Sequence, residues 1–189
     1  MNTDASPLIV IGGGLAGCEA AWQAATRGLD VTLYEMRPHV MTPAHQTDQL
    51  GELVCSNSLR SADPLTAIGS LKNEMRSLGS LVLRVADAHQ VPAGRSLAVD
   101  RERFARALTE TVAAHPRIRL ERAEVRALPD GPLIIASGPL TSAPLSSALA
   151  EFLGSESLHF YDAIAPIVDI ESLAQGSWFA GSRYDGGDD

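Results

Sequence analysis

Cysteine is scarce in this sequence, and its scarcity excludes a disulfide-stabilised fold. Only Cys18 and Cys55 occur among 189 residues, and they do not form a CxxC pair. Such a composition is typical of a reducing compartment. The sequence also lacks a secretory leader and an apolar run that could span a bilayer, because the short run Pro7–Val10 leads straight into glycines. We therefore expect a soluble, cytoplasmic protein with no membrane partner.

The five histidines have no spacing typical of metal ligands, so we predict no metal site. Lysine is almost absent. Arginine supplies 14 of the 15 positive charges. This bias suits bidentate phosphate contacts, but genome composition explains it equally well. The net charge of −8 argues against nucleic acid binding over the whole surface. The 45% hydrophobic content is sufficient for an ordinary globular core.

The first 35 residues carry the clearest pattern in the chain. An apolar run at Leu8–Ile11 predicts a strand, and apolar residues spaced by three and four predict a helix over Leu15–Arg27. Gly28 stands where a helix C-cap is expected. Asp30–Glu35 alternates and is rich in β-branched and aromatic residues, which predicts a second strand. Strand, glycine turn, helix and strand form a βαβ unit, so the fold class is α/β.

The turn between the first strand and the helix has the GxGxxG spacing of dinucleotide-binding proteins. It contains six residues: Gly12, Gly13, Gly14, Leu15, Ala16 and Gly17. Glu35, at the end of the second strand, is placed to accept hydrogen bonds from a ribose diol and would repel a 2′-phosphate. The alternative is a purely structural glycine turn, which the surrounding strands and helix disfavour. FAD and NAD remain as candidates.

A later strand, Pro132–Ala136, ends in the small-residue turn Ser137–Pro139 and favours FAD. This pattern resembles the flavoproteins of the glutathione-reductase superfamily, in which a late strand ending in a similar small-residue turn commonly closes the flavin site. We expect a Rossmann-like FAD/NAD(P)-binding domain of this type over residues 1–140, with an active-site loop at 37–64. Residues 141–189 would begin a second, substrate-side segment that is incomplete, so the fold is expected to be truncated.

The rest of the chain predicts further elements. We expect a long functional loop between Met36 and Pro64, and Asp100 as the N-cap of a helix. The expected helices are Leu71–Ala88, Arg101–Ala114 and Ala143–Leu153, and the expected strands are Ser96–Val99, Ile118–Glu121 and Glu124–Leu128, the last two in a small meander. Strand-like pieces in Leu158–Ile170, with Trp178 and Phe179, would belong to the second segment.

Cys55 lies in the polar stretch LVCSNS, and the residues alone leave two interpretations open. It is a nucleophile if nearby charge stabilises the thiolate, or it is a buried, unreactive side chain. Cys18 lies on the apolar stripe of the first helix, which predicts a core position. His45 and Asp48 could polarise a substrate, but we favour solvated positions for both.

Five segments of the chain, taken in order, resemble one family of flavoenzymes. They are similar to the folate- and FAD-dependent tRNA (uracil-5-)-methyltransferases, and they read IGGGLAGCEAAWQAATRGLDVTLYEMRP, MTPAHQTDQLGELVCSNSLRS, VPAGRSLAVDRERFA, IIASGPLTS and FYDAIAPIV. The EMRP, CSNSLRS and FYDAIAPIV blocks separate this family from the related GidA tRNA-modifying enzymes.

The resemblance implies a function and a set of site residues. FAD, reduced by NAD(P)H, takes carbon from 5,10-methylenetetrahydrofolate and delivers it as a methyl group to C5 of a T-loop uridine in tRNA. Uracil C5 is a poor nucleophile, and thiolate addition at C6 activates it; the resemblance assigns this covalent or acid/base work to Cys55. The implied FAD contacts are Gly12, Gly13, Gly14, Leu15, Ala16, Gly17, Glu35, Met36, Arg37 and Gly138.

The chain departs from the family pattern after Arg183-Tyr184. The family's proteins are much longer and continue into a block with a second functional cysteine, whereas this sequence ends in DGGDD. We therefore expect only the N-terminal part of such an enzyme. Two alternatives stay open: a generic FAD/NAD oxidoreductase, and a non-catalytic truncated remnant.

Overall fold

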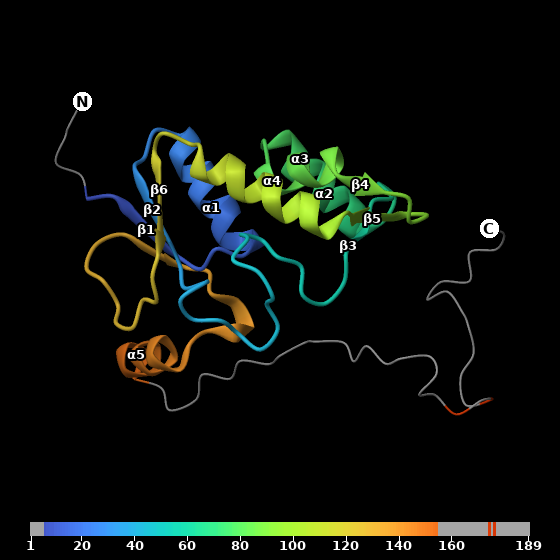
Figure 1. Ribbon diagram of the computed structural model, residues 1–189. Helices are drawn as coiled ribbons and strands as arrows, with labels where there is room; N and C mark the ends of the chain where they lie inside the picture. Colours follow the sequence, from blue (N-terminus) through green and yellow to red (C-terminus); the bar gives the residue numbers. More distant parts are fainter. Residues whose placement is uncertain (1–5, 155–173, 175, 177–189) are drawn as a thin grey trace.

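A four-stranded parallel sheet forms one end of the computed structural model, which describes residues 6–154, 174 and 176 (Figure 1). Its strands lie in the order β6-β2-β1-β7, so that β1 pairs with β2 and β7, and β2 also pairs with β6. Their bounds are β1 Leu8–Ile11, β2 Val31–Glu35, β6 Ile118–Arg122 and β7 Leu133–Ile135. Numbered along the chain within this sheet, the order is 3-2-1-4. That order is typical of dinucleotide-binding α/β folds, which confirms the predicted Rossmann-like class.

Helix α1 (Leu15–Thr26) connects β1 to β2 and buries its apolar stripe. Cys18 and Ala21 are fully buried on that stripe, which confirms the predicted core position of Cys18. The helix ends at Thr26 with Arg27 as its C-cap, and Gly28 follows with a φ of 93°. Glycine adopts this left-handed conformation without steric cost, so the turn leads directly into β2.

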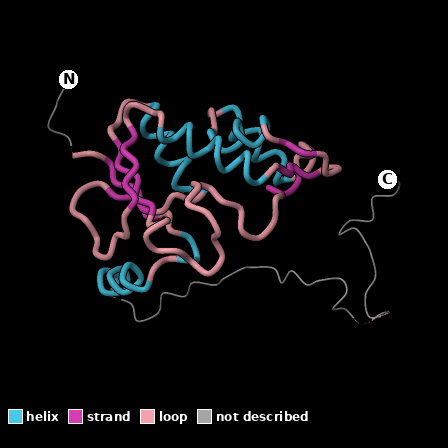
Figure 2. Tube along the Cα trace, viewed as in Figure 1, coloured by secondary structure: helices cyan, strands magenta, loops and turns pink. Residues whose placement is uncertain are grey.

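A large insertion separates β2 from its sheet neighbour β6. It contains a second, antiparallel sheet in the order β3-β5-β4, which lies at the opposite end of the described part from the parallel sheet (Figure 2). The elements of the insertion are β3 Ser58–Ser61, α2 Ala67–Ser77, α3 Leu81–Ala88, β4 Gln90–Val91, β5 Ser96–Val99 and α4 Arg101–Ala113. As predicted, the Asp100 side chain caps α4 by accepting a hydrogen bond from the Arg103 N–H.

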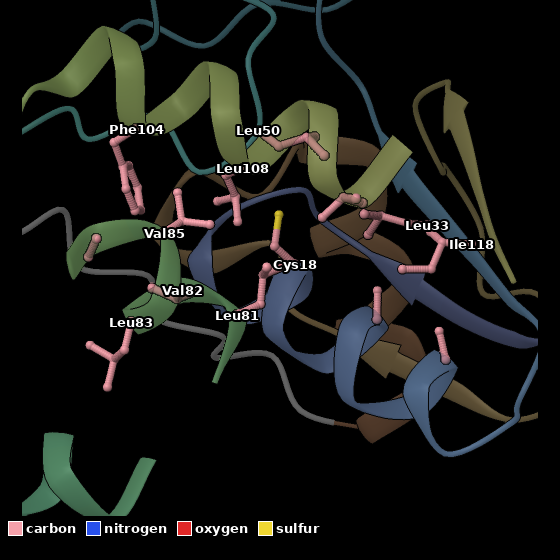
Figure 3. Packing of buried hydrophobic residues seen from close by; sticks show 14 of the residues in the cluster. Cys18, Leu33, Leu50, Leu81, Val82, Leu83, Val85, Phe104, Leu108 and Ile118 are labelled. Atoms are coloured by element: carbon pink, nitrogen blue, oxygen red, sulfur yellow. The ribbon is translucent and has the colours of Figure 1, made fainter. Parts of the chain in front are cut away.

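One hydrophobic core joins the insertion to the parallel sheet. Phe104 and Leu108 of α4 pack with Val85 of α3 and with Cys18 of α1, and all four side chains gather between the helices (Figure 3). Leu33 and Ile118 continue this core onto the parallel sheet. Because α1, α3 and α4 share these contacts, the insertion packs together with the parallel sheet around one core.

The single helix predicted over Leu71–Ala88 is wrong, because the chain breaks into α2 and α3. Gly79 between them has a φ of 75°, and the Ser80 hydroxyl caps α3 by accepting from the Leu83 N–H. The break places Leu71 and Leu78 outside the core, with 55% and 69% of their surface exposed. The apolar spacing runs across both helices, so periodicity alone did not reveal the break.

The predicted meander is also wrong. β6 pairs with β2 in parallel, with Leu33 opposite Leu120, whereas residues 123–132 form no strand. Within the expected loop, Ser58–Ser61 forms the short strand β3. The predicted helix α5 (Ala143–Leu153) is confirmed, and a 3₁₀ turn, Gly138–Leu140, precedes it. The strands expected in 158–170, with Trp178 and Phe179, lie outside the described residues.

Phe104→Ala is expected to lower the free energy of unfolding by about 3–5 kcal/mol, since it leaves a cavity under α4. The matched control is Phe152→Ala, because Phe152 is 75% exposed on α5, and its loss should be below about 0.5 kcal/mol. Urea unfolding followed by circular dichroism measures both values. Equal losses in the two variants would contradict the core described above.

Candidate functional site

A cleft of about 290 Å³ lies at the carboxyl ends of the parallel strands. Its walls are the turn after β1, the end of β2 with the loop that follows it, the segments after β6 and β7, and Leu145 of α5. The strand order reverses beside β1, since β2 follows β1 on one side of it and β7, the last strand of the sheet in the chain, lies on its other side. Open α/β sheets bind ligands at such a switch point. In Figure 1, α5 lies beyond the same end of the sheet.

The glycine turn after β1 is shaped by two close approaches to backbone atoms, at Gly12 and Gly17, and by one open space at Gly14. Gly12 has a φ of 106°, and a Cβ there would lie 2.6 Å from the Ala136 oxygen. A Cβ on Gly17 would lie 1.8 Å from the Gly12 oxygen. A Cβ on Gly14, in contrast, would meet nothing within 4 Å. The fold itself therefore requires Gly12 and Gly17, whereas the space beside Gly14 is free for a ligand.

The N-terminus of α1 faces this space without a side-chain cap. Its N-cap residue is Gly14, and its first turn contains no acidic residue. The first N–H groups of a helix have no partner within the helix, and its dipole is positive at that end. A phosphate group is the anion that such an end binds most commonly in nucleotide-binding folds.

Glu35 is buried beneath the glycine turn and is already fully hydrogen-bonded. Its Oε2 accepts from the Gly13 N–H at 2.9 Å and from Arg37 Nη2 at 3.2 Å. Its Oε1 accepts from the Arg37 backbone N–H at 3.0 Å and from Arg37 Nε at 2.9 Å. Burial alone would raise the pKa of the carboxyl, but the bonds from Arg37 and Gly13 outweigh it and lower the pKa below 4.5.

Arg37 is the largest fully buried side chain among the residues that the structure describes, and it connects Glu35 to the following loop. Its Nη1 donates to the Thr47 oxygen at 3.1 Å and to Glu52 Oε2 at 3.0 Å. Arg37 lines the cleft, but most of its donors bond to protein acceptors. Glu52 could not be found from the sequence, because an isolated carboxylate in a polar loop is expected to be solvated.

Cys55 lies just beyond the cleft, on the same loop. Its neighbour Val54 lines the cleft, while Cys55 itself is half-buried and not part of the wall. Cys18 differs, since its thiol is fully buried and donates to the Gly13 oxygen at 3.4 Å. Burial, with the nearby charge of Glu35, raises the pKa of Cys18 to about 12. Only Cys55 of the two is therefore available for thiolate chemistry.

His45 does not occupy the solvated position that we expected. It is half-buried against the cleft, and its Nδ1 shares a hydrogen bond of 2.6 Å with the Thr42 hydroxyl. Burial and the nearby charge of Arg37 lower its pKa, so the neutral imidazole is favoured. Asp48 is exposed, as predicted.

The remaining predicted contacts gather around the same cleft. Gly12, Gly13, Gly14, Leu15, Ala16, Glu35, Met36, Arg37 and Gly138 all line it. Gly17 lies behind the wall, under the Gly12 oxygen. Their assignment to a cofactor stays a prediction. Across the described residues, no group of three or more His, Cys, Asp or Glu side chains could hold a metal ion, and no helix is long and apolar enough to cross a membrane.

The family model of glucose inhibited division protein A matches residues 7–188 of this chain. The chain belongs to this family. The matched range includes the glycine turn, the loop with Cys55 and the segment after β7, so every residue that lines the cleft lies within it.

Individual family members show how much of a longer protein the chain represents. It is 60% identical to the methylenetetrahydrofolate--tRNA-(uracil-5-)-methyltransferase TrmFO of Moorella thermoacetica, covering 96% of this chain and 42% of that protein. The TrmFO of Rhodospirillum rubrum is also 60% identical, over 98% of this chain and 39% of its own length. The chain thus spans about two fifths of the curated relatives that it matches.

Solved structures support the fold. Aquifex aeolicus GidA in its form I crystal has a TM-score of 0.56 and 16% identity, over 72% of this chain and 26% of that chain. The form II crystal gives a TM-score of 0.53 and 18% identity, over 69% of this chain and 21% of that chain. At 16–18% identity, these similarities establish only a shared arrangement of strands and helices.

The pH dependence of stability should reveal the buried Glu35 carboxylate. Its pKa is lower in the folded chain than in the unfolded one, so its contribution is present above the unfolded pKa and is lost as the pH falls through the folded pKa. We expect the free energy of unfolding to decrease between about pH 5 and about pH 2, and to decrease less in Glu35→Gln. Urea titrations across this range measure it. Parallel curves for the two proteins would contradict the lowered pKa.

Proposed function

We propose that this chain binds FAD in the cleft and forms the FAD-binding part of a methylenetetrahydrofolate-dependent tRNA (uracil-5-)-methyltransferase. One observation supports this most directly. An open space beside Gly14, at the uncapped start of α1, occurs in a chain that is 60% identical to TrmFO proteins. The chain covers about two fifths of those proteins, so the activity, the substrates and the partners are part of the proposal.

The residues of the cleft fit a dinucleotide. The turn Gly12–Gly17 and the α1 N-terminus would hold the pyrophosphate, because backbone N–H groups and a helix dipole favour an anion there. Glu35 and Met36 would border the adenosine side. Since Glu35 already accepts four hydrogen bonds, its role would be to orient Gly13 and to disfavour a 2′-phosphate by its charge. Gly138 and Arg37 would complete the walls.

Bound FAD, with NAD(P)H as reductant, would supply the reducing power that converts a methylene carbon from 5,10-methylenetetrahydrofolate into a methyl group. The task of Cys55 would be to activate the T-loop uridine of tRNA. Its thiolate would add to uracil C6, which moves electron density to C5, and C5 would then form a bond to the methylene carbon. Loss of the C5 proton would expel the thiolate and restore the C5–C6 double bond. The half-buried place of Cys55 next to the cleft wall suits this role. A tRNA substrate would place the chain in the cytoplasm.

Purification of the chain with added FAD, followed by its visible absorption spectrum, tests the cofactor proposal. We expect flavin bands that heat releases. Gly14→Ala should fold within about 1 kcal/mol of the wild type, because its Cβ meets no protein atom. Its affinity for FAD should fall at least about tenfold, since the Cβ takes the space that the ligand needs. Gly17→Ala should lose the fold as well.

A folded, colourless wild-type chain would refute FAD binding. A chain that binds FAD but shows no response to methylenetetrahydrofolate in its flavin spectrum would favour a generic FAD/NAD oxidoreductase instead. Gly14→Ala with unchanged affinity would remove the pyrophosphate assignment alone.

Cys55→Ala should abolish methyl transfer and leave the flavin content unchanged. The measurement uses a chimera in which this chain replaces the matching region of the Moorella thermoacetica relative, with tritium release from C5-labelled uridine in tRNA as the assay. Cys18→Ala is the matched control, because that thiol is buried beneath Gly13, and it should keep at least about half of the wild-type rate. Retained transfer in Cys55→Ala would contradict the nucleophilic role.

A further inference from the structure

The loop that carries Cys55 is bonded to the glycine turn through the backbone of Gly13. The Gly51 N–H donates to the Gly13 oxygen at 2.8 Å. A Cβ on Gly13 would lie 2.5 Å from Leu50 Cδ2, so the loop packs directly on the turn. The N–H of the same residue is held by Glu35, which accepts a hydrogen bond from it at 2.9 Å. Any shift of the loop therefore changes the environment of the turn.

Glu52 closes the loop on itself. Its Oε1 accepts from the Gln46 N–H at 2.9 Å, and its Oε2 accepts from the Thr47 N–H at 3.1 Å and the Thr47 hydroxyl at 2.8 Å. The Oε2 atom also accepts from Arg37 Nη1 at 3.0 Å. Burial would raise the pKa of Glu52, but the hydrogen bonds from Gln46 and Thr47, together with the nearby charge of His45, outweigh it and lower the pKa. The carboxylate thus fixes residues 46–52 to a buried cation.

We propose that Glu52 is a positioning residue that sets the place of Cys55 relative to the cofactor cleft. The connection runs from Gly13 through Glu35 and Arg37 to Glu52, and then along the chain to Val54 in the cleft wall. Cys55 follows Val54 directly. The inference deepens the proposed function, on which it rests for the role of Cys55 and of the cleft.

The arrangement also couples the two ends of this connection. A ligand that stabilises the glycine turn favours the loop conformation bonded to it, and the effect is reciprocal for any two linked equilibria. Cofactor occupancy should therefore change how readily Cys55 reacts. The coupling needs the charge of Glu52, because Arg37 is buried and bonded to the loop through Glu52 and the Thr47 oxygen.

Glu52→Gln removes that charge with little change of shape. In either orientation, the new amide nitrogen would face a donor, either the Gln46 N–H or the group formed by Thr47 and Arg37. Two donors in contact leave both without an acceptor, which weakens the attachment of the loop. Glu102→Gln is the matched control. Glu102 lines the same cavity of about 500 Å³ as Glu52, and within the described part of the chain it makes no hydrogen bond to Arg37.

The experiment measures alkylation of Cys55 by iodoacetamide in the intact chain, as a pH–rate profile read by mass spectrometry. Cys18 reports the fold, because its buried thiol has a pKa of about 12 and reacts only when the domain unfolds. Without FAD, Glu52→Gln should change the rate at Cys55 at least about fivefold and shift the profile, while Glu102→Gln matches the wild type. With saturating FAD, the wild-type rate should change at least about threefold and the Glu52→Gln rate should not.

Equal Cys55 profiles in the wild type, Glu52→Gln and Glu102→Gln would overturn the positioning role, whether or not the chain binds FAD. Failure to bind FAD would count against the proposed function only. If Cys18 also reacts in Glu52→Gln, that variant has unfolded, and Thr47→Val then tests the positioning role in its place. It removes one donor to Glu52 and should still change the Cys55 rate, by a smaller factor than expected for Glu52→Gln, whereas a wild-type profile would overturn the proposal.

Discussion

The burial of the Arg37 guanidinium between Glu35 and Glu52 is the interaction on which the site depends. A buried cation is tolerated only when its donors are satisfied, and breaking such a group from one side is far more costly than leaving it intact. Here the guanidinium bonds to two carboxylates. Glu35 connects it to the glycine turn, and Glu52 connects it to the loop that carries Cys55. The geometry of this part of the cleft wall thus follows from the requirement that the donors of the buried Arg37 guanidinium have acceptors.

Local patterns in the sequence were sufficient for much of the fold. The βαβ unit, the Asp100 cap and helix α5 were predicted because residues close in sequence determine them. The meander and the long helix were predicted wrongly for a different reason. The partner of β6 is a strand far back in the chain, and the break at Gly79 depends on packing against α1, where Glu19 accepts hydrogen bonds from Ser80 and Val82.

In the candidate site too, features set by neighbouring residues could be predicted, whereas features set by contacts between distant residues could not. The glycine spacing and Glu35 could be found from the sequence, since the motif is local. The direction in which Arg37 turns, the half-buried place of His45 and the role of Glu52 could not be found. Each depends on side chains that meet only after the loop folds back on β2, and no spacing rule predicts such a meeting. The match to the glucose inhibited division protein A family shows which proteins this chain is related to, and the geometry alone does not show that.

The pairing of β2 with β6 has a consequence for the order of folding. These neighbours pair over five positions, yet the whole insertion with its antiparallel sheet and three helices lies between them in the chain. Contacts between distant segments form slowly, because the entropy of closing the intervening chain is lost before the contact stabilises it. The edge of β2 therefore stays open until α4 has docked and delivered β6. During synthesis, that unpaired edge is the part of the nascent domain most exposed to association with other chains.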